Sequence, residues 1–113
     1  MRLVLSALVL LAFAIPAAAA TDTELKVMIV GNWADSGVCA DGYLMFNADG
    51  TFASVAPAGS PPEEDLKGTY TITDGKLAGM TPQFEMPTIA ISFDGEKLIM
   101  GAGPTADILM HCK

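Results

Sequence analysis

Basic side chains are scarce in this chain, and this scarcity limits the kinds of molecule that the protein is expected to bind. The 113 residues include 6 lysines and arginines against 13 aspartates and glutamates, a formal net charge of −7 at pH 7. Proteins that bind nucleic acid neutralise its phosphates with clusters of lysine and arginine. The composition therefore excludes nucleic acid as an expected partner. An acidic surface either attracts basic partners or is simply a solvated face.

Side chains that carry catalysis are equally sparse. His111 is the only histidine, and it stands beside Cys112 without a matched acid. That setting provides neither a catalytic triad nor a zinc site. None of the few serines lies in the turn that presents a nucleophile in hydrolases. We therefore expect no catalytic residues and predict that the protein is not an enzyme.

Candidate metal ligands lack the spacing that metal sites need. Asp35, Asp41 and Asp49 do not fit the loop that supplies calcium with alternating oxygen ligands. The sequence has 7 methionines, Met1 included, and thioether sulfur binds copper(I). Because they are scattered rather than closely paired, filling of the core is their expected role. We expect no metal and no cofactor.

The only long apolar run, Leu3 to Ile15, lies at the N-terminus and ends at Pro16. Its length of about thirteen residues is short for a membrane-spanning helix, which needs roughly twenty. Small residues up to Ala20 match the pattern that signal peptidase cleaves. We predict a signal peptide over residues 1–20, with an uncleaved anchor as the alternative. The mature chain, residues 21–113, is then one domain, periplasmic or secreted and without a stable membrane anchor.

Cysteine is limited to two residues, Cys39 and Cys112. In an oxidising compartment a disulfide is the default state of such a pair, and only one intramolecular pairing exists. A bridge over this length of chain stabilises by about 4 kcal/mol in the chain-entropy model, comparable to the net stability of a small domain. We predict the disulfide Cys39–Cys112, with free thiols or an intermolecular pair as alternatives.

Three Asp-Gly pairs each separate two short runs of β-forming residues, and this dipeptide is a strong hairpin signal. The pairs are Asp49-Gly50, Asp74-Gly75 and Asp94-Gly95. The runs around them cover residues 42–46, 51–55, 68–72, 76–78, 88–93 and 97–100. With a first strand from Gly31 and a last strand over 106–113, the sequence predicts an all-β, antiparallel up-and-down barrel or meander of about seven or eight strands.

The two ends of the mature chain allow finer predictions. A capping-box pattern from Thr21 to Glu24 predicts a short N-terminal helix ending at Gly31, with a first strand as the alternative. In the last strand, Ile108, Met110 and Cys112 share one face. If that face is inward, Cys112 lies at the edge of the core, where it can meet Cys39 and close the barrel.

The tripeptide Gly31-Asn32-Trp33 opens a stretch that resembles the lipocalin-like, or calycin, group of small exported bacterial β-barrels. Further similar features are Phe46 to Phe52, Gly68-Thr69-Tyr70 and Leu98, and the resemblance covers about residues 31–113. It implies a barrel in which Trp33 packs across one end as a structural plug. Full lipocalins are much longer, so the short strands here are expected to leave little interior once side chains fill it.

The resulting functional expectation is a non-enzymatic exported binding module. The leading version is an inhibitor or interaction protein that presents an exposed loop to a protease or a lysozyme. The loop is formed by Ser60, Pro61, Pro62, Glu63 and Glu64, whose prolines reduce its entropy loss on binding and whose acids complement a basic surface. One alternative is a carrier of a small apolar ligand or lipid, with Tyr43, Phe84 and Met86 near the barrel mouth. Another is a structural envelope protein.

Overall fold

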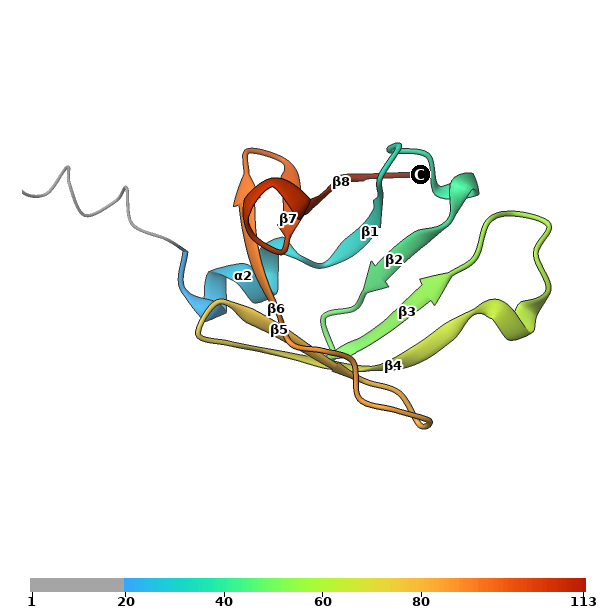
Figure 1. The fold of residues 1–113 in the computed structure, drawn as a ribbon, viewed down its shortest axis with the longest axis horizontal. Helices are drawn as coiled ribbons and strands as arrows, with labels where there is room; N and C mark the ends of the chain where they lie inside the picture. Colours follow the sequence, from blue (N-terminus) through green and yellow to red (C-terminus); the bar gives the residue numbers. More distant parts are fainter. Residues whose placement is uncertain (1–19) are drawn as a thin grey trace, which may run out of the picture.

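The structure is a computed structural model, and it describes residues 20–113. The predicted signal peptide lies outside the described residues except for Ala20. The eight strands form one closed barrel in which each pairs with its sequence neighbours and the last returns to the first (Figure 1). They are β1 (Gly31–Ala34), β2 (Tyr43–Phe46), β3 (Thr51–Val55), β4 (Leu66–Thr73), β5 (Lys76–Met80), β6 (Ile89–Asp94), β7 (Lys97–Met100) and β8 (Asp107–His111).

All eight ladders are antiparallel, including the β1–β8 pair that closes the barrel. The prediction of an all-β, up-and-down barrel is confirmed. Closure gives every strand a partner on both sides, so no strand is left as an unpaired edge. Within residues 20–113, no helix combines the length and apolar character that crossing a bilayer demands.

The predicted Asp-Gly turns form, with different geometries. At the β4–β5 turn both Asp74 (φ 53°) and Gly75 (φ 75°) have positive φ, the pattern of a type I′ turn. At the β6–β7 turn the two residues between the strands are Gly95 and Glu96, and of these only Gly95 has positive φ (63°). Asp94 therefore ends its strand rather than entering the turn.

A short helix, α2 (Asp22–Met28), precedes the barrel. Thr21 caps it: the Thr21 side chain accepts a hydrogen bond from the Glu24 amide, and the Glu24 carboxylate accepts one from the Thr21 amide. This reciprocal pair is the predicted capping box, so the helix prediction is confirmed. The inner face of α2 and the residue after it place Leu25 and Ile29 in the core.

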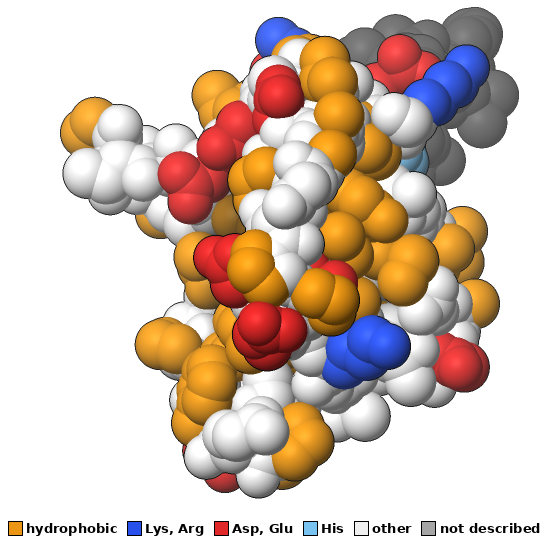
Figure 2. All heavy atoms as spheres, turned by 90° about the vertical axis from the view of Figure 1, so that its right-hand side faces the viewer, with side chains coloured by type: hydrophobic (Ala, Val, Ile, Leu, Met, Phe, Trp, Pro, Cys, Tyr) orange, Lys and Arg blue, Asp and Glu red, His pale blue; other side chains and the backbone are white. Residues whose placement is uncertain are grey.

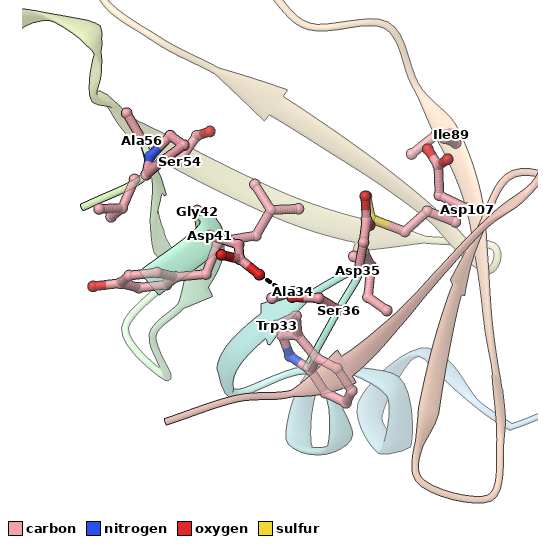
Figure 3. A pocket seen from close by; sticks show the side chains of 16 residues that line it. Trp33, Ala34, Asp35, Ser36, Asp41, Gly42, Ser54, Ala56, Ile89 and Asp107 are labelled. Carbon is pink, nitrogen blue, oxygen red and sulfur yellow. Dashed lines mark hydrogen bonds between the residues drawn. The ribbon is translucent and has the colours of Figure 1, made fainter. Parts of the chain in front are cut away.

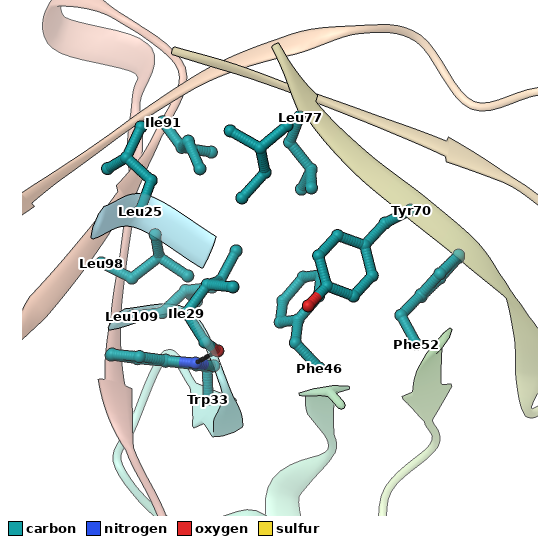
Figure 4. Close-up of a cluster of buried hydrophobic side chains, with 11 residues drawn as sticks. Leu25, Ile29, Trp33, Phe46, Phe52, Tyr70, Leu77, Ile91, Leu98 and Leu109 are labelled. Atoms are coloured by element: carbon teal, nitrogen blue, oxygen red, sulfur yellow. Dashed lines mark hydrogen bonds between the residues drawn. The ribbon is translucent and has the colours of Figure 1, made fainter. Parts of the chain in front are cut away.

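The core fills the barrel from the α2 end (Figure 4). Alternate residues of the strands point inward, as the twofold alternation of β6 predicted. Trp33 is 1% exposed and donates a 2.8 Å hydrogen bond from Nε1 to the Ile29 carbonyl. The expected role of Trp33 as a buried core residue is therefore confirmed. The core comprises Leu25, Ile29, Trp33, Phe46, Phe52, Tyr70, Ile72, Leu77, Ile91, Leu98 and Leu109.

The sequence placed Cys112 at the core edge only if Ile108 and Met110 also face inward. In the structure, the other face of the last strand is the inward one. Leu109 is buried, whereas Ile108 and Met110 are 54% and 39% exposed. The register decides this: His111 pairs with Trp33 across β1 and β8, so His111 and Leu109 share the side of the sheet that Trp33 occupies.

The methionine prediction also needs correction. Met100 and Met86 pack against the core, but Met28, Met80 and Met110 are 40%, 51% and 39% exposed. Met80 is exposed because its strand neighbour Gly79 takes the inward position opposite Tyr70. Filling of the core therefore accounts for only some of these side chains.

Cys39 and Cys112 form the predicted disulfide, with their Cα atoms 5.1 Å apart. Cys39 begins a 3₁₀ turn, η2 (Cys39–Asp41), and Cys112 follows β8. The Cys112 amide also donates a 3.0 Å hydrogen bond to the Asn32 carbonyl in β1. The bridge therefore fixes the connection between β1 and β2 to the strand that closes the barrel.

Candidate functional site

The two ends of the barrel differ. At one end, α2 is tied to the β4–β5 turn, because the Asp22 carboxylate accepts hydrogen bonds of 2.8 and 2.9 Å from the amides of Asp74 and Gly75. At the other end are the longer connections over residues 35–42, 56–65, 81–88 and 101–106, and the first two of these border an opening. We call this opening the mouth.

A cavity of about 600 Å³ occupies the mouth. Its apolar lining comes from inward-facing residues of β1, β2, β6, β7 and β8, and its polar lining from β2, β3, β8 and the β1–β2 connection (Figure 3). The apolar side chains include Trp33, Leu44, Ile89, Met100 and Leu109. The polar ones are Asp35, Ser36, Asp41, Tyr43, Ser54 and Asp107. The volume falls within the range of small-molecule sites, roughly 300–1,000 Å³.

A second, smaller space of about 60 Å³ lies deeper in the barrel; we call it the inner chamber. Leu44, Ile89 and Met100 line both spaces, so the inner chamber adjoins the mouth cavity. Its other lining residues are Phe46, Phe52, Tyr70, Leu77, Gly79, Met86 and Pro87. Apolar spaces of this kind exclude water and accept apolar guests.

Tyr70 contributes the one hydroxyl near the inner chamber, and that hydroxyl is already engaged. It donates a 2.8 Å hydrogen bond to the Asn47 carbonyl. Burial, followed by the negative charge of Asp49, raises the pKa of the Tyr70 phenol above its ordinary value of 10.0. Tyr70 is therefore neutral under physiological conditions and presents its ring to the chamber.

Small residues explain why side chains leave this end of the barrel open. Ser54 and Ala56 line the mouth, and Ser54 pairs with the inward-facing Leu44, so a larger side chain at Ser54 would project into the space. Deeper in the barrel, a Cβ atom at Gly79 would lie 3.2 Å from the Met86 sulfur, so the glycine leaves room for that thioether. The expectation of little interior space agrees with the inner chamber, at about 60 Å³, and the larger space is the open mouth cavity.

The rim of the mouth is acidic. Asp35, Asp41 and Asp107 line it, and Asp41 accepts a 2.9 Å hydrogen bond from the Ser36 hydroxyl. Connections 35–42 and 56–65 lie on the right of Figure 1, and this side faces the viewer in Figure 2. Figure 2 shows hydrophobic and acidic side chains intermingled over this face, with few basic ones. The mouth therefore combines acidic and apolar surface.

The structure separates the three residues predicted near the barrel mouth. Tyr43 lines the mouth cavity, and Met86 lines the inner chamber. Phe84 lines neither: its side chain is 48% exposed on the 81–88 connection, beside Pro62. Sequence reasoning missed Asp107, Ser54 and Met100, because their inward direction depends on the register of strands far apart in the chain.

The predicted loop, Ser60 to Glu64, lies outside the cavity in the connection between β3 and β4. It contains a 3₁₀ turn, η3 (Pro62–Glu64), and its Pro61, Pro62, Glu63 and Glu64 are exposed. Only the start of the same connection, Ala56 and Pro57, reaches the mouth cavity. The loop and the cavity are therefore separate candidate surfaces.

The other side chains considered for catalysis or metal binding are either already in contact with other groups or not gathered into one site. The His111 ring stacks on Trp33 with centroids 3.7 Å apart, and both cysteines are in the disulfide. Within residues 20–113, no three histidine, cysteine, aspartate or glutamate side chains gather in a way that would hold a metal ion.

Comparison with known proteins gives no relative: no family model, curated protein or solved structure matches the chain.

Proposed function

We propose that this protein is a non-enzymatic binding module that holds a small apolar or amphiphilic ligand in the open end of its barrel. The observation that carries the proposal is the mouth cavity with the inner chamber adjoining it, which share the lining residues Leu44, Ile89 and Met100. Small-ligand sites are usually concave and combine apolar side chains with a few polar groups that orient the ligand. The cavity therefore supports the carrier over the other versions that the sequence suggested.

The lining supports one orientation of such a ligand. Its apolar part would displace water from the surfaces of Leu44, Ile89 and Met100, which is favourable by about 25 cal/mol for each Å² buried. Its polar part would remain near Tyr43 and Ser54, which line the outer cavity. A preformed site loses little entropy on binding, since the strands that carry these side chains are already paired.

We further propose that the protein is exported and belongs to the lipocalin-like group. The glycine at the start of β1 and the buried Trp33, which joins the barrel to α2, support the grouping, as does the up-and-down topology. The Cys39–Cys112 disulfide supports an oxidising compartment.

Titration with the neutral apolar fluorophore N-phenyl-1-naphthylamine tests the ligand site. We expect saturable enhancement of its emission, together with a change in the emission of Trp33, the only tryptophan and a lining residue of the cavity. Ser54→Phe places a ring in the mouth cavity and should weaken binding at least tenfold, about 1.4 kcal/mol. Native mass spectrometry of the protein from its own source would show a natural ligand directly.

Ser92→Phe is the matched control, because Ser92 is exposed on the outer face of β6. It introduces the same side chain away from the cavity and should leave the affinity unchanged. Equal loss of binding in both variants, or emission that rises without saturation, would remove the cavity from consideration as a ligand site.

A further inference from the structure

A second concave surface lies outside the barrel, between two connections that are distant in sequence. It has a volume of about 490 Å³ and is lined from one side by Pro62, Glu63 and Leu66 and from the other by Pro82, Gln83 and Phe84. We call it the loop groove. It shares no lining residue with the mouth cavity or the inner chamber.

The first wall of the loop groove is held in place by hydrogen bonds at its base. The Ala56 amide donates to the Asp65 carboxylate at 2.8 Å, and the Ala58 amide donates to the Ala40 carbonyl at 2.8 Å. Ala40 follows Cys39, so the disulfide anchors this wall to β8. Within the loop, the Asp65 amide donates to the Pro62 carbonyl.

The second wall is a tight turn organised by Thr81, which is 5% exposed. The Thr81 hydroxyl oxygen accepts hydrogen bonds from the amides of Gln83 and Phe84, each at 3.2 Å, and the Thr81 amide donates to the Phe84 carbonyl at 2.9 Å. These bonds fix the backbone of Phe84 while its ring remains 48% exposed. Exposed aromatic rings on ordered backbone are typical anchors of protein interfaces.

The charge around the loop groove determines the kind of partner. Glu63 and Asp65 line the first wall, Glu64 lies between them in the sequence, and Glu85 follows Phe84 of the second wall. Lys67 is the single basic residue in the lining. A second copy of the chain would bring the same acids against these, which is repulsive. A groove that contains both apolar and acidic side chains is complementary to a segment that carries basic side chains beside apolar ones.

We propose that the loop groove is a docking surface for a partner protein that inserts an apolar side chain against Phe84 and Pro62 and places lysine or arginine side chains beside Glu63 and Glu64. This interaction goes beyond the ligand-binding function proposed above and does not depend on it. It gives the predicted loop, Ser60 to Glu64, a role shared with a turn that the sequence had associated with the barrel mouth.

The test uses the disulfide-bonded protein of residues 21–113 labelled with ¹⁵N, and a blocked synthetic heptapeptide of alternating lysine and leucine. Saturable amide shifts are expected at residues 63–67 and 83–85, which flank Pro62 and Pro82. Replacing each lysine of the peptide with glutamate should abolish them, and replacing each leucine with serine should weaken the affinity at least fivefold. Phe84→Ser, and separately Glu63→Gln with Glu64→Gln, should each weaken binding of the original peptide at least fivefold.

Two controls separate docking from general attraction to an acidic protein. Val27→Ser removes a side chain that is 73% exposed on α2, and Asp94→Asn with Glu96→Gln removes two acids from the β6–β7 hairpin. Neither should change the affinity. Shifts spread over all acidic surfaces, equal losses in the controls, or a Phe84-dependent dimer in sedimentation would each overturn the proposal. Unchanged binding of the naphthylamine probe in Phe84→Ser would show that the two sites are independent.

Discussion

The indole nitrogen of Trp33 lies 2.8 Å from the carbonyl oxygen of Ile29, and this hydrogen bond joins the first strand of the barrel to the helix that precedes it. Both side chains are among the most completely buried in residues 20–113. The hydrogen bond satisfies the indole N–H of Trp33, the polar group of an otherwise apolar side chain. A buried indole N–H without an acceptor would be costly. Helix and barrel are therefore parts of one core.

Trp33→Phe should lower the free energy of unfolding by about 2–3 kcal/mol, because it removes volume from the core and leaves the Ile29 carbonyl without its donor. Urea denaturation followed by far-ultraviolet circular dichroism measures the change. Tyr43→Phe, which removes only a hydroxyl at the mouth, should stay within about 0.5 kcal/mol of the parent. Equal midpoints for the two variants would show that the Trp33 bond contributes nothing.

Asp22→Asn should reduce stability at neutral pH and flatten its dependence on pH. Hydrogen bonds from the Gly75 amide and then the Asp74 amide hold the pKa of the Asp22 carboxyl below its ordinary value of 3.8. A carboxylate with a lowered pKa stabilises the fold fully above that ordinary value, and the contribution is lost as the pH falls through the folded pKa.

The measurement for Asp22 is the thermal midpoint as a function of pH. Parent and Asp22→Asn should differ most near pH 7 and converge in strong acid, below the folded pKa. Glu96→Gln, in the exposed β6–β7 turn, is the control for the loss of one negative charge. A constant difference between parent and Asp22→Asn at every pH would contradict the linkage.

Replacing both cysteines, Cys39→Ser with Cys112→Ser, should lower stability by about 4 kcal/mol, because the bridge spans a sequence separation of 73 residues. Urea denaturation measures the loss, and the reduced parent protein should reproduce it. Hydrogen exchange at the Ala58 amide, which is bonded to the Ala40 carbonyl beside the bridge, should also accelerate. An unchanged midpoint after complete reduction would refute the stabilising role.

Sequence patterns predicted the fold well because each feature that they indicate depends on only a few neighbouring residues. The Asp74-Gly75 turn and the capping box at Thr21 need only their own backbone geometry, and both form as expected. The two faces of β6 and of β4 follow the alternation of their side chains. The disulfide was predictable because two cysteines allow only one intramolecular pair.

The candidate site was less predictable because it depends on register between distant strands. The direction of Leu109 is set by the pairing of His111 with Trp33, across most of the chain. The mouth cavity depends on the coincidence of the small Ser54 with an inward-facing position, opposite Leu44 of β2. Strand length carries no information about this coincidence. The exposed position of Phe84 depends on the turn formed by Thr81, whose hydroxyl bonds are a local signal that could have been recognised.

The pairing around the barrel is uneven, and this gives the barrel a preferred line of opening. Two ladders have only two paired positions each: Trp33 with His111 and Ala34 with Met110 between β1 and β8, and Lys76 with Ala90 and Leu77 with Ile89 between β5 and β6. The disulfide lies beside the first ladder, whereas the second is extended by backbone hydrogen bonds from Ile91 to Gly75 and from Met86 to Gly79 and by side-chain packing, without a covalent link. Thermal breathing should therefore part β5 from β6 first. Since Ile89 lines both internal spaces, that movement would enlarge them from the side.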